Sequence, residues 1–180
     1  MVGTRVTIRY ARALFELAQE KKVLSQVADD LNYILRMYQS SKDFRQLLES
    51  PVVQAADKKK IFVRLFRERL NPLTGEFLDM VVEKGRENLL AVIIQRFHEL
   101  LDREKGILRG QLDTAFRFSD SQLAALKKQM DKITGKNVII RQHVNPDLLG
   151  GFVVRLGDTV IDTSIKSQLA RLRETMVSGE

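Results

Sequence analysis

Residues 138–162 read VIIRQHVNPDLLGGFVVRLGDTVID, and this stretch predicts three β-strands separated by two turns. The segment Asn145-Pro146-Asp147 cannot continue a strand, because proline lacks the amide hydrogen that a sheet requires. Gly150-Gly151 can adopt backbone angles that other residues avoid, so this pair suits a bend into the next strand or a close approach of two backbones. Gly157-Asp158 suits a two-residue hairpin loop. The stretch therefore indicates a small sheet that contains a β-hairpin.

The two-residue loop sets the register of the predicted hairpin. Arg155 then faces Val160, and the flanking pairs are Leu156 with Thr159 and Val154 with Ile161. Alternation places one apolar group on a single face: Phe152, Val154, Leu156 and Ile161. We expect a helix to cover this face. The opposite face, which carries Arg155 and Asp162, is more polar and is either solvated or used for a contact.

Upstream of Gly106, apolar residues recur at helical spacing from Thr4 to Lys105. Six helices are predicted, with apolar stripes at Tyr10–Ala18, Leu24–Tyr38, Phe44–Leu48, Ile61–Leu70, Phe77–Val82 and Leu90–Leu101. Ser50-Pro51 is predicted to end the third helix and Asn71-Pro72 the fourth, because a residue before proline is driven out of the helical region. Lys84-Gly85 and Lys105-Gly106 are typical C-terminal ends.

After Gly106 the apolar period changes from that of a helix to that of a strand, and the alternating pattern continues to Phe118. Ser119 with Gln122 predicts a capping box for a helix that ends at Gly135. A last helix carries the apolar stripe Ile165, Leu169, Leu172 and Met176. We therefore predict a mainly α chain with an N-terminal six-helix bundle, residues 1–105, followed by a small α/β C-terminal domain with a β-hairpin, residues 106–180.

The composition of the 180 residues is that of an ordinary globular protein, with 44% hydrophobic and 29% charged residues. No apolar run approaches the roughly 20 residues of a membrane span. The start of the chain enters an amphipathic pattern directly, which favours a cytoplasmic protein and disfavours an unprocessed organellar precursor, although a mature organellar form stays open. The lack of cysteine excludes disulfides and thiolate metal sites. A net charge of +7 favours acidic partners.

Catalytic, metal and cofactor sites find little support in the sequence. His98 and His143 are the two histidines, and neither stands at zinc-ligand spacing from a second ligand. Carboxylates alternate with lysine and arginine as on solvated helix faces. Gly135-Lys136 leads from a helix into a strand, the reverse of the order that cradles phosphate. We expect no catalytic residue, metal or cofactor.

The densest basic cluster lies on the predicted fourth helix: Lys58, Lys59, Lys60, Arg64, Arg67 and Arg69. These side chains either bind phosphates or form the solvated face of an amphipathic helix. The aromatic residues sit at apolar core spacing and do not alternate with the cations, which disfavours nucleic acid as a partner. A basic nucleic-acid-binding adaptor is nevertheless the alternative function for this chain.

The first helix carries small residues, Ala11, Ala13 and Ala18, that allow another helix to approach closely. Two explanations stay open. The small residues serve tight packing within the bundle, or they form a groove that accepts an amphipathic helix from a partner.

Three motifs resemble a known family. The run from Val144 to Gly157, which continues into Val160-Ile161-Asp162 and Ser164-Ile165, is similar to the C-terminal signature of the delta subunit of rotary ATP synthases, the oligomycin-sensitivity-conferring protein of mitochondria. The opening Tyr10-Ala11-Arg12-Ala13-Leu14-Phe15 resembles the N-terminal pattern of the same family, and so does Gly85-Arg86 followed by Leu89-Leu90. The resemblance covers essentially the whole chain.

This resemblance implies a non-catalytic stator subunit at the cytoplasmic face of the plasma membrane, held there through the complex. It implies two partners, the N-terminal helix of an alpha subunit and the ends of the b subunits of the peripheral stalk. The groove for the alpha subunit is expected between the first and fifth helices, at Tyr10, Ala13, Leu14, Leu17, Phe77, Leu78 and Val81. The stalk contact is expected at Gly150, Gly151, Arg155 and Asp162, together with the last helix.

Overall fold

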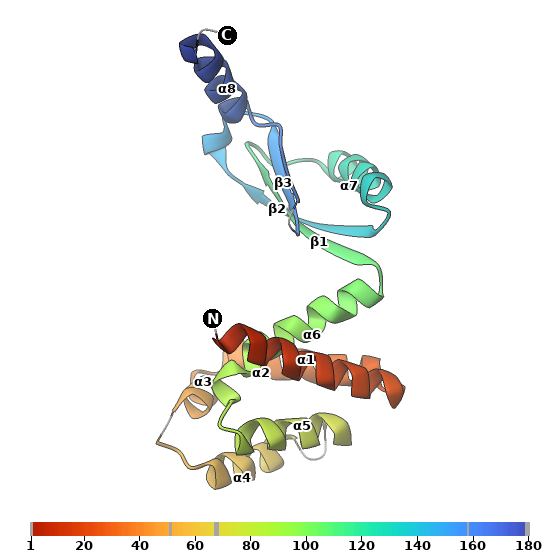
Figure 1. Ribbon diagram of the computed structural model, residues 1–180, viewed down its shortest axis with the longest axis vertical. Coiled ribbons are helices and arrows are strands. Elements are labelled where there is room, and N and C mark those ends of the chain that lie inside the picture. Colours follow the sequence, from red (N-terminus) through yellow and green to blue (C-terminus); the bar gives the residue numbers. More distant parts are fainter. Residues whose placement is uncertain (1, 51, 67–68, 158, 179–180) are drawn as a thin grey trace. The chain divides into compact units, whose positions relative to one another are not determined.

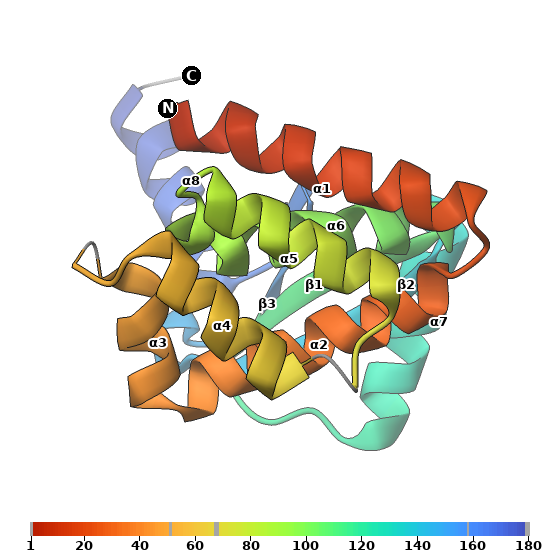
Figure 2. The same ribbon diagram turned by 90° about the horizontal axis from the view of Figure 1, so that it is seen from below.

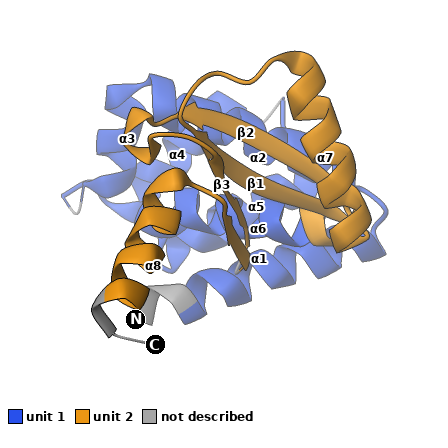
Figure 3. Ribbon diagram, turned by 90° about the horizontal axis from the view of Figure 1, so that it is seen from above, with its two compact units in different colours: residues 1–101 blue, residues 102–180 orange. Residues whose placement is uncertain are grey.

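The computed structural model describes residues 2–50, 52–66, 69–157 and 159–178 (Figure 1). The chain is mainly helical, with one small four-stranded sheet toward its C-terminal end. It divides into two compact units, Met1–Leu101 and Asp102–Glu180, which Figure 3 colours separately. This division falls in the last turn of the helix that precedes Lys105-Gly106. Among the described residues, no helix has both the length and the hydropathy that crossing a bilayer requires.

The first unit consists of helices and one short 3-10 turn. Its elements are α1 Val2–Glu20, α2 Leu24–Ser40, α3 Lys42–Glu49, α4 Ala55–Phe66, α5 Pro72–Glu83, η1 Glu87–Leu89 and α6 Leu90–Glu104. The six α-helices are drawn in Figure 2, and all of them contribute side chains to one apolar core. Leu14, Leu31 and Phe97 are fully buried in this core. The helical periodicity of the sequence is therefore confirmed across this unit.

Asn71-Pro72 begins a helix, whereas the sequence predicted that it ends one. Asn71 is the N-cap of α5, and its side-chain oxygen accepts a hydrogen bond from the backbone N–H of Leu73. Proline at the first helical position costs no hydrogen bond and has a suitable backbone angle. The described part of α4 ends at Phe66, so Leu70 lies in the connection. The predicted stop at Ser50-Pro51 includes Pro51, which lies outside the described residues, but α3 does end at Glu49.

The second unit is a sheet with two helices. Its elements are β1 Ile107–Thr114, α7 Asp120–Thr134, β2 Asn137–Val144, η2 Pro146–Leu148, β3 Phe152–Leu156, β4 Thr159–Asp162 and α8 Ile165–Ser178. The strand order is β2-β1-β3-β4, with β1 parallel to β2 and the other two pairings antiparallel. The predicted capping box at Ser119 and the left-handed C-cap at Gly135 are both confirmed. The strand that was expected to reach Phe118 ends at Thr114, because its partners β2 and β3 also end at that level.

The predicted hairpin has the expected register. Arg155 pairs with Val160, and the neighbouring pairs are Leu156 with Thr159 and Val154 with Ile161. Asp158, the second loop residue, lies outside the described residues. The apolar face packs under α7, where Leu126 and Met130 meet Leu112, Val138, Val154 and Leu156. The helix cover that we expected for this face is therefore confirmed.

Candidate partner-binding surfaces

The first candidate surface lies between α1 and α5. The two helices run in opposite directions (Figure 2), and the ring of Tyr10 meets the ring of Phe77 edge-on, with 6.4 Å between centroids. Tyr10, Ala13 and Leu17 stand three and seven residues apart, so they share one flank of α1. Tyr10 and Phe77, two of the side chains predicted to receive the alpha subunit, are therefore in contact between the two helices.

Burial divides these seven predicted residues into two groups. Four belong to the apolar core: Leu14, Phe77, Leu78 and Val81. Tyr10 is half-buried, Ala13 is exposed, and 44% of Leu17 is exposed. Of the seven, only Tyr10, Ala13 and Leu17 therefore offer surface to a partner, while the four core residues hold the two walls in place.

Met80 is an exposed apolar residue beside this surface that the sequence prediction did not include. It lies three residues after Phe77, on the same flank of α5, and 36% of it is exposed. The sequence feature that could have identified Met80 is its i, i+3 spacing from Phe77. It was not included because it lies outside the apolar stripe that defines the buried face of α5. We call Tyr10, Ala13, Leu17, Phe77 and Met80 together the docking flank.

The three lysines of the basic cluster are paired with carboxylates, whereas Arg64 on α4 is exposed and Arg69, beyond the end of α4, donates to the hydroxyl of Tyr33. Lys58 is buried, and its Nζ lies 2.5 Å from Oε1 of Glu87. Lys59 pairs with Asp79 and Glu83 of α5, and Lys60 pairs with Asp57. Arg67 lies outside the described residues. Because the three lysines are neutralised within the chain, only Arg64 and Arg69 of the described cluster stay open to an anionic partner, which weakens the nucleic-acid-binding alternative.

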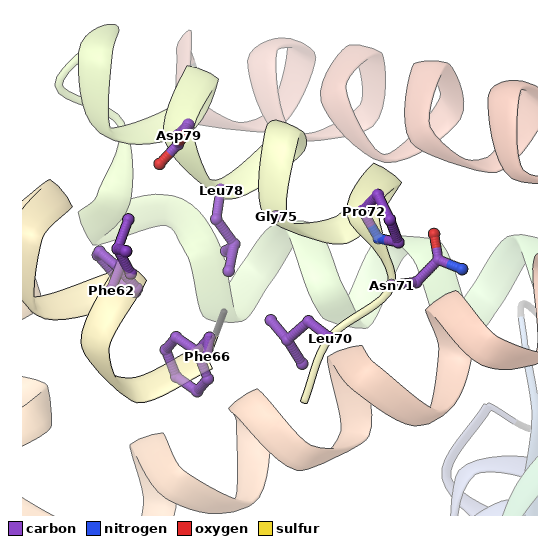
Figure 4. A pocket seen from close by; sticks show the side chains of 9 residues that line it. Phe62, Phe66, Leu70, Asn71, Pro72, Gly75, Leu78 and Asp79 are labelled. Atoms are coloured by element: carbon purple, nitrogen blue, oxygen red, sulfur yellow. The ribbon is translucent and has the colours of Figure 1, made fainter. Parts of the chain in front are cut away.

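A separate hollow of about 450 Å³ lies between α4 and α5 (Figure 4). Its walls are mostly apolar, with Phe62 and Phe66 on α4 and Leu78 on α5, and Asn71 and Asp79 provide polar groups at its edge. Gly75 borders it with no atom within 4 Å of the position that a Cβ would take. The hollow lines the side of α5 away from Phe77 and Met80, so it is distinct from the docking flank.

The predicted stalk residues Gly150, Gly151 and Asp162 lie together at the start of α8. The N–H of Ile165 donates to the carbonyl of Gly150, and the N–H of Thr163 donates to the carbonyl of Phe152. Gly151 has a φ of +72°, and a Cβ there would lie 2.3 Å from the carbonyl oxygen of Thr163. These residues therefore connect α8 to the sheet, which is a positioning role.

Asp162 fixes the first turn of α8 by accepting hydrogen bonds. Its carboxylate accepts from the N–H of Ser164 at 2.9 Å and from the hydroxyl of Ser167 at 2.7 Å. The hydrogen bond from Ser167, followed by those from Ser164, lowers the pKa of the Asp162 carboxyl below its ordinary value, and the charge of Arg171 adds to this effect. The ionised form is the one that the folded state favours.

Acidification is expected to weaken this connection. Because the pKa of Asp162 is lower in the folded than in the unfolded chain, its contribution is complete above the unfolded value, about 3.9, and is lost as the pH falls through the folded value. Asp162→Asn is expected to cost about 0.5–1 kcal/mol near neutral pH, the low end for a hydrogen bond to a charged group near solvent. Thermal unfolding of the wild type and of Asp162→Asn between pH 3 and pH 7 measures the difference in their stability. This difference should shrink only at the acid end, and a difference that stays constant down to pH 3 contradicts the role assigned to the ionised Asp162.

α8 presents its apolar stripe to solvent. Ile165 is 44% exposed, Leu169 52%, Leu172 60% and Met176 84%. The spacing of these residues places them on one side of the helix. A stripe of this length on an isolated helix is typical of a docking surface.

Arg155, the fourth predicted stalk residue, belongs to a polar cluster on the other face of the sheet. It donates to the carboxylate of Asp113, whose second oxygen lies 3.4 Å from Nδ1 of His143. Burial is the largest single influence on the pKa of Asp113 and acts to raise it. Hydrogen bonds from Gln111 and Arg155, with the charges of Arg155 and His143, outweigh burial and lower the pKa. Asp113 thus holds Arg155 and His143 in place as an ionised, buried carboxylate.

Comparisons with known proteins agree on one family. The profile of the ATP synthase delta (OSCP) subunit matches residues 6–176. The ATP synthase subunit delta of Carboxydothermus hydrogenoformans is 38% identical over 98% of this chain and 99% of its own length. That of Moorella thermoacetica is 37% identical over 97% of each chain.

A solved structure shares the fold. A chain in the cryo-EM structure of the Toxoplasma gondii mitochondrial ATP synthase hexamer superposes with a TM-score of 0.73 at 26% identity, over 95% of this chain and 97% of that one. Sequence and fold lead to the same conclusion. The chain belongs to the ATP synthase delta (OSCP) subunit family.

Proposed function

We propose that this chain joins the catalytic hexamer of an ATP synthase to the peripheral stalk, with one partner on each of its two units. Family membership makes it a non-catalytic, stator-linking subunit of that complex. The exposed apolar residues of the docking flank are the observation that carries the finer assignment. They lie between α1 and α5, where the family resemblance placed the alpha subunit.

The helical unit acts as a six-helix bundle that receives the N-terminal helix of an alpha subunit on the docking flank. An amphipathic helix laid along Tyr10, Ala13 and Leu17 would bury its apolar side against α1 and would reach Phe77 and Met80 on α5. Ala13 permits a close approach of the two backbones. Leu14, Leu78 and Val81 contribute indirectly, because as core residues they fix the spacing of the walls.

The C-terminal unit, which begins near Lys105-Gly106, holds the ends of the b subunits. The apolar stripe of α8 offers the contact, and Gly150, Gly151 and Asp162 determine the direction in which that stripe points. Arg155 contributes from the sheet. The b subunits in turn keep the chain at the cytoplasmic face of the plasma membrane.

This arrangement suits a part that resists torque. Rotation of the central shaft pushes the hexamer in the opposite sense, so a static connection must stay bound while proton flow drives synthesis. A nanomolar contact corresponds to about 12 kcal/mol, which a well-filled apolar groove can supply. Because the contacts with the hexamer and with the stalk lie on separate units, each contact can stay bound while the stalk bends.

Leu17→Asp is expected to weaken binding of a peptide that spans the N-terminal helix of the alpha subunit by tenfold or more, a loss of about 1.4 kcal/mol. A carboxylate at this position would be buried against the apolar side of the peptide without a partner. Calorimetric titration of the full chain measures the effect. Leu65→Asp is the matched control, since Leu65 lies on α4 and is 41% exposed, close to the 44% of Leu17.

Binding by wild type and by Leu65→Asp, with loss in Leu17→Asp, supports the proposal. No binding by wild type, or equal binding by both variants, contradicts it. Leu14→Asp and Val81→Asp are unsuitable for this test. Each residue is 1% exposed, so a charge there would unfold the core before it reported on the groove.

A further inference from the structure

The sheet of the C-terminal unit has one face covered by a helix and a second face on which Val153 and Asp113 are buried but other side chains are exposed. α7 packs on the face that carries Leu112, Val138 and Val154. On the opposite face Ile139 is 40% exposed and Val160 is 58% exposed, although strand residues of this kind are usually buried. We call this second face the open face. It consists of Ile139, Arg141 and His143 on β2, Arg109, Gln111 and Asp113 on β1, Val153 and Arg155 on β3, and Val160 and Asp162 on β4. Arg109 is paired with Asp102, and the carboxylate of Asp162 is engaged by Ser164 and Ser167.

Two arginines stand in one row across the open face. Arg141 pairs with Gln111 on the neighbouring strand, and Gln111 pairs with Arg155 on the next. The backbones of the two arginines are therefore about 9–10 Å apart, twice the spacing between strands. A carboxylate between them would be within reach of both guanidinium groups, and a partner with two or three acidic side chains could engage the whole row.

The two arginines differ in whether a carboxylate of this chain pairs with them. Arg155 is held by Asp113, whose side chain is 9% exposed, while half of the Arg155 side chain remains open to solvent. Within the described parts of the chain, no carboxylate lies within ion-pair distance of Arg141. Asp113 therefore pre-positions Arg155 and His143, and Arg141 supplies a positive charge without an internal counterpart. The exposed groups of the row favour an anionic partner.

We infer that the open face binds an acidic, amphipathic segment of the peripheral stalk, with carboxylates against Arg141 and Arg155 and apolar side chains against Ile139 and Val160. This inference rests on the proposed stalk contact and extends it from α8 to the sheet. The apolar residues exclude a purely electrostatic contact, because Ile139 on β2 and Val160 on β4 border the arginine row at both edges. Charge complementarity determines which partner binds, and Ile139 and Val160 add apolar area that is buried in the contact.

The test compares two charge reversals of equal size in the full chain. The probe is the purified, membrane-free part of the b subunits of the same complex, titrated by calorimetry at low and at moderate salt. Arg141→Glu is expected to weaken binding at least tenfold, and the loss should shrink as salt rises. Lys128→Glu changes the net charge by the same amount on an exposed position of α7, outside the open face, and is expected to change binding less than twofold.

The outcomes separate this inference from the proposal on which it rests. Equal binding by Arg141→Glu and Lys128→Glu, with tight binding by wild type, overturns the open-face assignment and leaves the stalk contact standing on α8. Failure of wild type to bind the b subunits overturns both. Arg141→Gln tests the sign of the charge, because it should weaken binding less than Arg141→Glu.

Discussion

Replacing Lys58 by methionine is expected to lower the free energy of unfolding of the helical unit by about 3–5 kcal/mol, the usual cost of leaving one partner of a buried ion pair uncompensated. The side chains of Lys58 and Glu87 are 3% and 12% exposed, and the ammonium group also donates to the carbonyl oxygen of Leu48. The other oxygen of Glu87, Oε2, is buried and accepts no hydrogen bond from a described residue. Lys58 is thus the ion-pair partner of a carboxylate that is largely shielded from water. Urea unfolding followed by circular dichroism measures the loss.

Two further variants test whether the loss of stability comes from the ion pair between Lys58 and Glu87. Lys58→Met combined with Glu87→Leu removes both charges and is expected to recover most of the lost stability. Lys60→Met removes a neighbouring lysine whose side chain is 77% exposed, and its effect should stay within about 0.5 kcal/mol. Equal stability of Lys58→Met and Lys60→Met would contradict a stabilising role for the ion pair between α4 and η1.

Gly151→Ala is expected to detach the start of α8 at a cost of about 2–5 kcal/mol. A left-handed backbone costs a residue with a Cβ about 1–2 kcal/mol, and overpacking of a filled site adds about 1–3 kcal/mol. The new methyl group would meet backbone atoms, the carbonyl oxygen of Thr163 at 2.3 Å and Cα of Ser164 at 3.1 Å. Neither can rotate away, because Thr163 is itself hydrogen-bonded to Phe152.

Gly150→Ala is the matched control. Its Cβ would meet Cδ1 of Ile165 at 2.5 Å, the end of a flexible side chain that can change rotamer, so the cost should be smaller. Amide hydrogen exchange at Thr163 and Ile165 reports on the junction directly. Exchange should accelerate strongly in Gly151→Ala and only weakly in Gly150→Ala, and binding of the b subunits should follow the same order. Unchanged exchange in Gly151→Ala contradicts the positioning role.

Local signals were sufficient to predict the hairpin register and the boundaries of α7. A two-residue loop permits only one set of cross-strand neighbours, and the Ser119 capping box and Gly135 are complete within a few residues of each helix end. Periodicity also identified core residues on every helix of the first unit. These features are determined by residues that lie close together in the sequence.

Features that depend on distant residues were not predictable. Lys58 stands among other cations, and nothing near it shows that Glu87, 29 residues away, lies against it. Periodicity assigned Leu14 and Leu17 to one stripe, but the packing of α1 buries the first and exposes the second. For Gly150-Gly151 a bend or a close backbone approach was expected, while the carbonyl of Thr163 that requires glycine at position 151 comes from beyond the hairpin. The docking flank could be placed only once α1 and α5 were seen as neighbours.

The most direct test of the central claim is whether this chain alone connects the two halves of the complex. Gel filtration of the isolated catalytic hexamer with the membrane-free b subunits should give separate peaks, and addition of the chain should merge them into one peak that contains all three. An excess of the alpha-subunit N-terminal peptide should release the hexamer and leave the chain bound to the b subunits. Co-elution of hexamer and b subunits without the chain, or a merged peak that survives excess peptide, contradicts a link through the docking flank.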